Sequence, residues 1–169
     1  MSQVVTLFQE EFKRRVFVES YSRIENCLDR LTQDQIWHKA NKNTNSIGNL
    51  VLHLMGNVRQ YICSGLGGQD DIRQRDLEFL ASSVCNTSIL RTSMQNLKVD
   101  VTSVIDSLTE KNLTELYKVQ GFEENGTSIL IHVIEHFSYH VGQIAQYTKL
   151  LLDEDLGFYA GLDLNIKSK

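Results

Sequence analysis

The 169-residue sequence contains no proline. Average usage of about 5% would give roughly eight prolines in a chain of this length. Because proline interrupts the interior of a helix, a chain without it can form long unbroken helices. The periodicity of the apolar residues then indicates where such helices are expected.

Four long segments show the spacing of amphipathic helices, in which apolar residues recur every three to five positions. In the first segment the apolar stripe begins with Val4, Phe8 and Phe12. The third segment has a regular heptad spacing, which is typical of helices packed at a shallow angle. The four helices are predicted at about Ser2–Arg30, Ser46–Ser64, Leu90–Leu108 and Ile129–Leu152.

The connections between these helices carry weaker signals. Thr32 and Gln35 form a capping-box pattern, which predicts a short helical turn through Trp37. Gln69–Ser83 is a polar connection long enough to cross the end of a bundle, with a short helix near its end at Asp76–Leu80. Leu116–Phe122 is expected to be irregular or extended.

Four helices of this length with one long central connection predict an all-α fold, a four-helix bundle. The length fits a single domain over residues 1–169. The apolar C-terminal tail, with Phe158, Tyr159, Leu162 and Leu164, is expected to pack on the domain or on a partner.

Composition excludes several classes of protein. The net charge of −4 argues against nucleic-acid binding, which needs a basic face. No apolar run reaches the length of a membrane span, and the N-terminus does not match a signal peptide. Cys27, Cys63 and Cys85 form no Cys-x-x-Cys pair, so we expect free thiols and a cytoplasmic location.

The histidines indicate where the chemistry lies. His132, His136 and His140 recur every four residues, which places them along one helical face. His53 lies within an otherwise apolar helix, with Asn49 and Asn57 one turn to either side. Two facing polar stripes inside one bundle indicate a shared site, and imidazole is the commonest metal ligand in proteins.

The same face offers further polar groups and an open coordination shell. Gln143 follows His140 by three residues, so Asn49, Asn57 and Gln143 are candidates for supporting the ligands or contacting substrate. Three imidazoles leave coordination positions open, as in catalytic or exchangeable metal sites.

Two other motifs compete with this interpretation. His132–His136 matches His-x-x-Glu-His, the inverted zinc-protease signature, with Glu135 as base. Only 33 residues follow His136 in the 169-residue chain, which leaves no room for a protease-sized cleft domain. A di-iron bundle requires Glu-x-x-His motifs on two helices, and the sequence contains none.

The segments Ser46–Asn57 and His136–Ile144 together resemble the DinB/YfiT-like superfamily. The resemblance implies an up-down-down-up four-helix bundle, usually a homodimer. It also implies a divalent metal, zinc or nickel, held by His53, His136 and His140, with His132 outside the triad. Many relatives carry arginine where this chain has Val141, so the resemblance says less about substrate.

Characterised members of that superfamily include thiol-dependent S-transferases. We therefore expect a metal-dependent enzyme of the thiol S-transferase type, acting on a small molecule with a low-molecular-weight thiol as cosubstrate. The physical reason is that a divalent cation lowers the pKa of a bound thiol or water. Two alternatives stay open: metal-assisted hydrolysis, and a non-catalytic dimeric bundle that binds metal.

Overall fold

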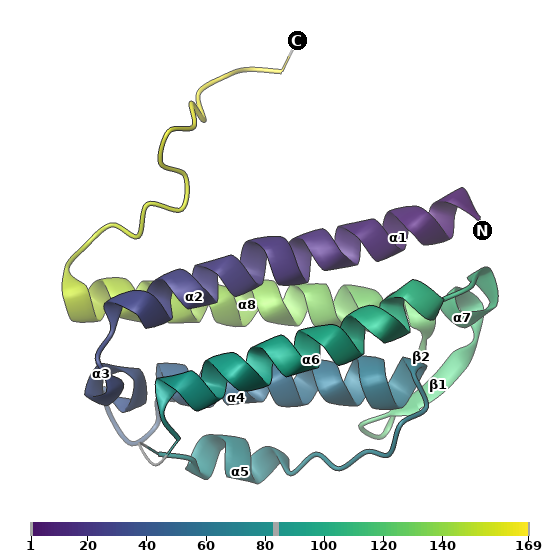
Figure 1. Ribbon diagram of the computed structural model, residues 1–169, viewed down its shortest axis with the longest axis horizontal. Coiled ribbons are helices and arrows are strands. Elements are labelled where there is room, and N and C mark those ends of the chain that lie inside the picture. The colour runs from purple at the N-terminus through teal and green to yellow at the C-terminus, as the bar shows by residue number, and fades with distance from the viewer. Residues whose placement is uncertain (1, 83–84, 169) are drawn as a thin grey trace.

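The computed structural model describes residues 2–82 and 85–168, in which four long helical segments surround a common core (Figure 1). The first is continuous through α1 (Gln3–Lys13), the π-helical η1 (Arg14–Ser20) and α2 (Tyr21–Arg30). The others are α4 (Ile47–Val58) continued by the π-helical η2 (Arg59–Leu66), α6 (Thr87–Ser107) and α8 (Gly126–Leu152). Shorter elements connect them: α3 (Gln33–Trp37), α5 (Arg75–Leu80), α7 (Glu110–Thr114), β1 (Leu116–Val119) and β2 (Phe122–Asn125).

The four long segments run in two directions. In Figure 1, α1–α2 and α8 run from right to left, whereas α4 and α6 run from left to right. The order is therefore up, down, down, up, and α5 lies along the connection that returns the chain from the end of η2 to the start of α6. Within the described residues, no helix combines the length and apolarity needed to cross a bilayer.

Side-chain caps fix where the helices begin. Thr32 and Gln35 form the expected capping box at α3, with the Thr32 hydroxyl accepting from the Gln35 amide. Ser46 and Asn49 form a second one at α4. Asn86 and Asn125 cap α6 and α8 with their side-chain oxygens. Each cap satisfies amide groups that have no partner within the helix, so the boundaries follow from local sequence.

The core confirms most of the predicted apolar faces. On α6 the whole heptad seam from Leu90 to Leu108 is buried. The first helix needs one correction: Val4 is 56% exposed, and Val5 takes the expected core position. The reason is geometric, because each step of four residues overshoots a 3.6-residue turn by about 40°.

The five-residue step from Val16 to Tyr21 coincides with η1, where the helix widens to π geometry. Both side chains are buried. The wider turn therefore keeps the apolar stripe of the first helix on the core side over its full length.

The extended segment after α7 forms a β-hairpin, which the sequence analysis did not predict as a pair of strands. β1 and β2 pair in antiparallel register, with Val119 opposite Phe122. The two turn residues, Gln120 and Gly121, both have positive φ, as in the type I′ turns that close tight hairpins.

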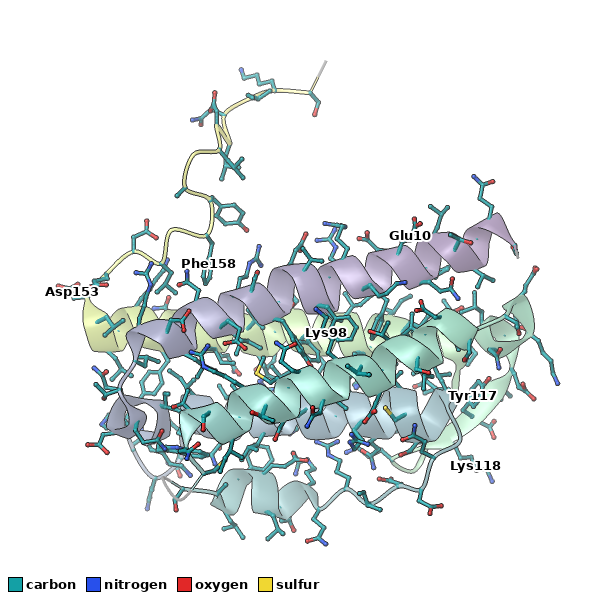
Figure 2. The ribbon with its side chains drawn as sticks, in the orientation of Figure 1. Glu10, Lys98, Tyr117, Lys118, Asp153 and Phe158 are labelled. Carbon is teal, nitrogen blue, oxygen red and sulfur yellow. The ribbon has the colours of Figure 1, made fainter. Side chains whose placement is uncertain are left out.

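The C-terminal tail leaves the bundle after Asp153, whose left-handed backbone ends α8 (Figure 2). Leu156 is buried and Phe158 is half-buried, with the Arg23 guanidinium 5.6 Å from the centre of its ring. Leu162 and Leu164 are exposed on the part that extends away from the helices (Figure 1). The tail therefore packs on the domain only at its start, and the homodimer implied by the family resemblance stays a prediction.

The three cysteines are free. Cys27 and Cys63 are buried and Cys85 is half-buried, and burial raises the pKa of all three thiols. A thiol with a raised pKa is a poor nucleophile at neutral pH, so burial disfavours these side chains as nucleophiles.

Two helical glycines give opposite predictions for the same substitution. A Cβ on Gly48 would lie 2.7 Å from the Trp37 ring, whereas a Cβ on Gly142 would meet nothing within 4 Å. We expect Gly48→Ala to lower the free energy of unfolding by about 1–3 kcal/mol through overpacking. Gly142→Ala should raise it by about 0.5–1 kcal/mol, because alanine is the better helix former. Urea titration of both variants measures the difference, and equal shifts would contradict the packing of α3 on α4.

Candidate metal centre

The polar stripes of α4 and α8 meet inside the bundle. His53 on α4 is buried, and His136 and His140 on α8 are half-buried. One ligand nitrogen from each of these three residues lies within 4.8 Å of the other two. The Nε2 atoms of His53 and His136 are 3.0 Å apart. The structure thus brings together the three histidines that the sequence analysis singled out as a triad.

His132 lies in the next layer of the bundle and is not part of this group. Its ring stacks on Tyr61 at 4.1 Å between centroids, and its Nε2 accepts from the Asn57 amide at 3.3 Å. Asn57 therefore faces His132 and not the triad, although its buried Oδ1 has no hydrogen-bond partner among the residues that the structure describes.

This placement also disfavours the protease-like pairing. That motif requires His132 and His136 as ligands and Glu135 beside them. Instead, the rings of His132 and His136 stack 5.4 Å apart, and Glu135 is exposed. The convergence of His53 with His136 and His140 is the arrangement that the structure favours.

Burial keeps the α8 histidines uncharged. It lowers the pKa of His136 to about 3, with further lowering from the neighbouring His140 and His53. Burial is also the main reason that the pKa values of His140 and His132 are lowered. Because only the neutral imidazole can ligate a metal, His136 and His140 are ready to bind at neutral pH.

A buried carboxylate supports the triad from the connection before α6. Glu78 on α5 places Oε2 2.9 Å from His53 Nδ1, which leaves His53 Nε2 facing His136. Burial alone would raise the pKa of Glu78, but hydrogen bonds from His53 and Arg73 outweigh it and lower the pKa. A carboxylate on the second nitrogen of a ligating histidine is the usual support of a metal site. Glu78 could not be identified from the sequence because its segment has no diagnostic spacing.

Asn49 acts on the site through this connection. Its side chain caps α4 and donates to the carbonyl oxygens of Glu78 and Ala81, each at 2.9 Å. It is fully buried and contacts the α5 backbone rather than an open cavity. Asn49 therefore holds Glu78 against His53.

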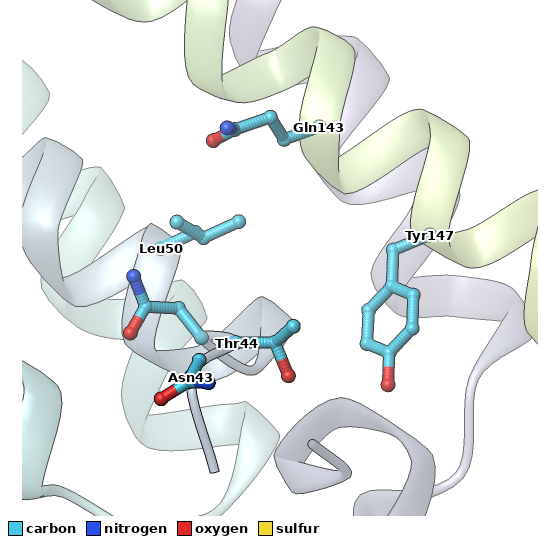
Figure 3. Close-up of a pocket in the computed structure, with 6 residues that line it drawn as sticks. Asn43, Thr44, Leu50, Gln143 and Tyr147 are labelled. Atoms are coloured by element: carbon cyan, nitrogen blue, oxygen red, sulfur yellow. The ribbon is translucent and has the colours of Figure 1, made fainter. Parts of the chain in front are cut away.

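Gln143 lies between the triad and a cavity of about 300 Å³. Its Oε1 is 2.7 Å from Nδ1 of His140, and its side chain also lines the cavity. Figure 3 shows Gln143 and Tyr147 on α8 across this space from Leu50 and the loop before α4. The other lining residues are Asn43, Thr44 and Asn45. A substrate in the cavity would thus contact Gln143, which in turn contacts the candidate ligand His140.

The donor set fits a divalent transition metal. Three imidazole nitrogens converge, and two of the rings are oriented by oxygen partners, Glu78 for His53 and Gln143 for His140. No thiolate closes the shell, so positions remain for exogenous ligands. Imidazole suits zinc, nickel, copper and iron, so the residues do not select among them.

Alanine substitutions separate the triad from its neighbour. We expect His53→Ala and His140→Ala each to lose most of the bound metal, whereas His132→Ala keeps it. The reason is that His132 stacks on Tyr61 outside the group of converging nitrogens. Metal stoichiometry is measured on folded protein by elemental analysis. Loss of metal from His132→Ala with retention in His140→Ala would make the triad assignment wrong.

The lowered pKa of His136 predicts acid sensitivity of the metal-free protein. Unfolded histidine titrates near pH 6.5, whereas native His136 stays neutral to about pH 3. As the pH falls below about 6.5, only the unfolded chain takes up this proton, so stability decreases. We expect Tm to fall between pH 7 and pH 5, and His136→Gln to flatten the fall. The exposed His38 provides the control, and an equal flattening in His38→Gln would contradict the assignment.

Comparisons with known proteins agree with this architecture. The crystal structure of a conserved protein from Enterococcus faecalis matches with a TM-score of 0.72 and 16% identity, covering 91% of this chain and 100% of that chain. A DinB-like protein from Bacillus cereus matches with a TM-score of 0.61 and 19% identity, covering 84% and 91%. No curated protein shows a significant match in sequence.

The structural matches are below 25% identity and establish the fold, which is DinB-like. A family model described as "Protein of unknown function (DUF1572)" matches residues 4–160, nearly the whole chain. The chain therefore belongs to the DUF1572 family, and its fold is that of DinB-like proteins.

Proposed function

We propose that the protein is a metal-dependent enzyme of the thiol S-transferase type. In this proposal His53, His136 and His140 hold a divalent cation, zinc or nickel, and a low-molecular-weight thiol is the cosubstrate. The observation that carries the proposal is the convergence of three imidazole nitrogens within 4.8 Å, together with a cavity lined by Gln143, whose side chain contacts His140. Neutral ligands and an open shell are the features of a catalytic site rather than a structural one.

The cation would supply one chemical effect: it lowers the pKa of a bound thiol, so that the nucleophilic thiolate is populated near neutral pH. The protein orients the histidine rings that would hold the cation. Glu78 and Gln143 fix the rings of His53 and His140 through their second nitrogens. Phe79 packs against the His53 ring at 4.9 Å between centroids.

The size of the cavity is the reason that we propose a small molecule as the substrate. Its volume of about 300 Å³ is at the lower end of the range for small-molecule sites. Leu50 offers an apolar wall, and Thr44 and Tyr147 offer hydroxyl groups for orientation. A macromolecular substrate would need a longer groove than these lining residues form.

Turnover of a chromogenic electrophile, 1-chloro-2,4-dinitrobenzene, tests the proposal. Protein loaded with Zn²⁺ or Ni²⁺ is assayed with and without an added thiol, and conjugate formation is followed by absorbance. We expect conjugation faster than the uncatalysed reaction of thiol with electrophile only when both the metal-loaded protein and thiol are present. The conjugation rate of the His140→Ala variant should fall to that of the metal-free protein, because the variant would lose the ion.

Two results would contradict the transferase proposal. Metal-dependent hydrolysis of an activated ester without any thiol requirement would favour a water nucleophile instead. Thermal stabilisation by Zn²⁺ with no turnover of any electrophile, across several thiols, would favour a non-catalytic bundle.

A further inference from the structure

The connection between η2 and α6 contributes a buried ion pair next to the triad. The Arg73 and Glu78 side chains are only 4% and 10% exposed. Arg73 donates from Nε to Glu78 Oε1 at 2.7 Å and from Nη2 to Glu78 Oε2 at 3.0 Å. Its Nη1 donates to Gln60 Oε1 at 2.8 Å. Burying two charges costs desolvation energy, so a pair held this tightly calls for a role beyond stability.

Helix α4 makes room for this pair with a glycine. A Cβ on Gly56 would lie 1.9 Å from Glu78 Oε1 and 3.0 Å from Arg73 Nε. Gly56 follows His53 by three residues, which places both on one side of the helix. The missing side chain therefore lets the carboxylate lie directly against α4 within reach of the His53 ring.

Glu78 and Arg73 favour opposite tautomers of His53. Its Nδ1 lies 2.9 Å from Glu78 Oε2 and 3.2 Å from Arg73 Nη2. A carboxylate only accepts hydrogen bonds and a guanidinium only donates them. Glu78 therefore favours a proton on Nδ1, whereas Arg73 favours a bare Nδ1 with the proton on Nε2. Only the first tautomer leaves a lone pair on Nε2, the nitrogen that faces His136.

We propose that the Arg73–Glu78 pair selects the tautomer of His53 and thereby prepares it as a ligand. Glu78 holds the ring proton on Nδ1. Arg73 binds the carboxylate through Nε and Nη2, and the Glu78 oxygen lies closer to His53 Nδ1, at 2.9 Å, than Arg73 Nη2 does, at 3.2 Å, which favours the proton on Nδ1. Arg73 and Glu78 are therefore positioning residues, and the missing side chain of Gly56 leaves the space that they occupy. The role in ligation rests on the proposed metal site, whereas the tautomer itself is a property of the metal-free protein.

The tautomer can be measured directly by ¹⁵N–¹H correlation NMR of metal-free protein labelled at histidine, at pH 8. We expect the Nδ1–H form of His53 in the parent protein. A glutamine at position 78 cannot accept all three hydrogen bonds that the carboxylate accepts from His53 Nδ1, Arg73 Nε and Arg73 Nη2, because one of its oxygens is replaced by an amide donor. We therefore expect Glu78→Gln to shift the population toward Nε2–H. Adding Arg73→Met removes the competing donor and should restore Nδ1–H.

Zinc affinity provides the second measurement, with Zn²⁺ alone in competition with a colorimetric chelator. Glu78→Gln should weaken binding by about 10- to 100-fold, as is usual for carboxylates behind a ligating histidine. Gly56→Ala should weaken it as well, because its methyl group displaces Glu78. Glu135→Gln is the matched control, since it makes the same change at an exposed site beside His136. Circular dichroism verifies that each variant is folded.

The outcomes separate this proposal from the proposed function. A His53 that stays Nδ1–H in Glu78→Gln, or zinc affinity unchanged within threefold, would overturn the role of Glu78. Failure of Arg73→Met to restore the tautomer would overturn the role of Arg73. Absence of turnover in the parent protein would bear only on the proposed function, because the tautomer is measured without metal or substrate.

Discussion

The constraint on which the rest of the structure depends is the burial of His53 in the middle of the apolar helix α4. An imidazole in such a position is costly unless both of its nitrogens find partners. Glu78 contacts Nδ1, and Nε2 faces His136. The first contact requires the chain after η2 to return along α4, where Asn49 holds it by two backbone carbonyls. The second requires α8 to pack beside α4 with its histidines turned inward, so one buried side chain fixes the placement of two elements.

The helices and the triad could be predicted from the sequence because both rest on local regularity. The heptad seam ending at Leu108 and the capping box at Thr32 need only neighbouring residues to be recognised, and the structure contains both. The spacing of His136 and His140 indicates one helical face. A histidine in an apolar run indicates a buried polar group that needs a partner. Neither pattern specifies which α8 histidines meet His53; the family resemblance supplied that choice, and the geometry agrees with it.

The remaining features depend on contacts between distant segments. Glu78 and Arg73 lie in the polar connection predicted at Gln69–Ser83, where charged residues are ordinarily solvated, so nothing in their spacing indicates that they are buried. The last residue of that connection, Ser83, lies outside the described residues. From the sequence alone, Gly56 is only a residue that destabilises a helix. The position of Glu78 against α4 explains why a glycine is needed there. Residue spacing also failed to predict that Val5, rather than Val4, lies in the core. The reason is that repeated four-residue steps drift away from the helical period of 3.6 residues.

The central claim is that α4 and α8 hold one metal ion between them through His53, His136 and His140. Crystallography of protein purified without a histidine tag, with data collected at the absorption edge of the bound metal, tests this most directly. The account predicts one anomalous peak between the two helices, about 2.0–2.1 Å from a nitrogen of each histidine if the ion is zinc. It also predicts that Glu78 remains hydrogen-bonded to the far side of the His53 ring. A peak coordinated by His132 and His136 without His53, or metal-replete crystals with no peak at this site, would contradict it.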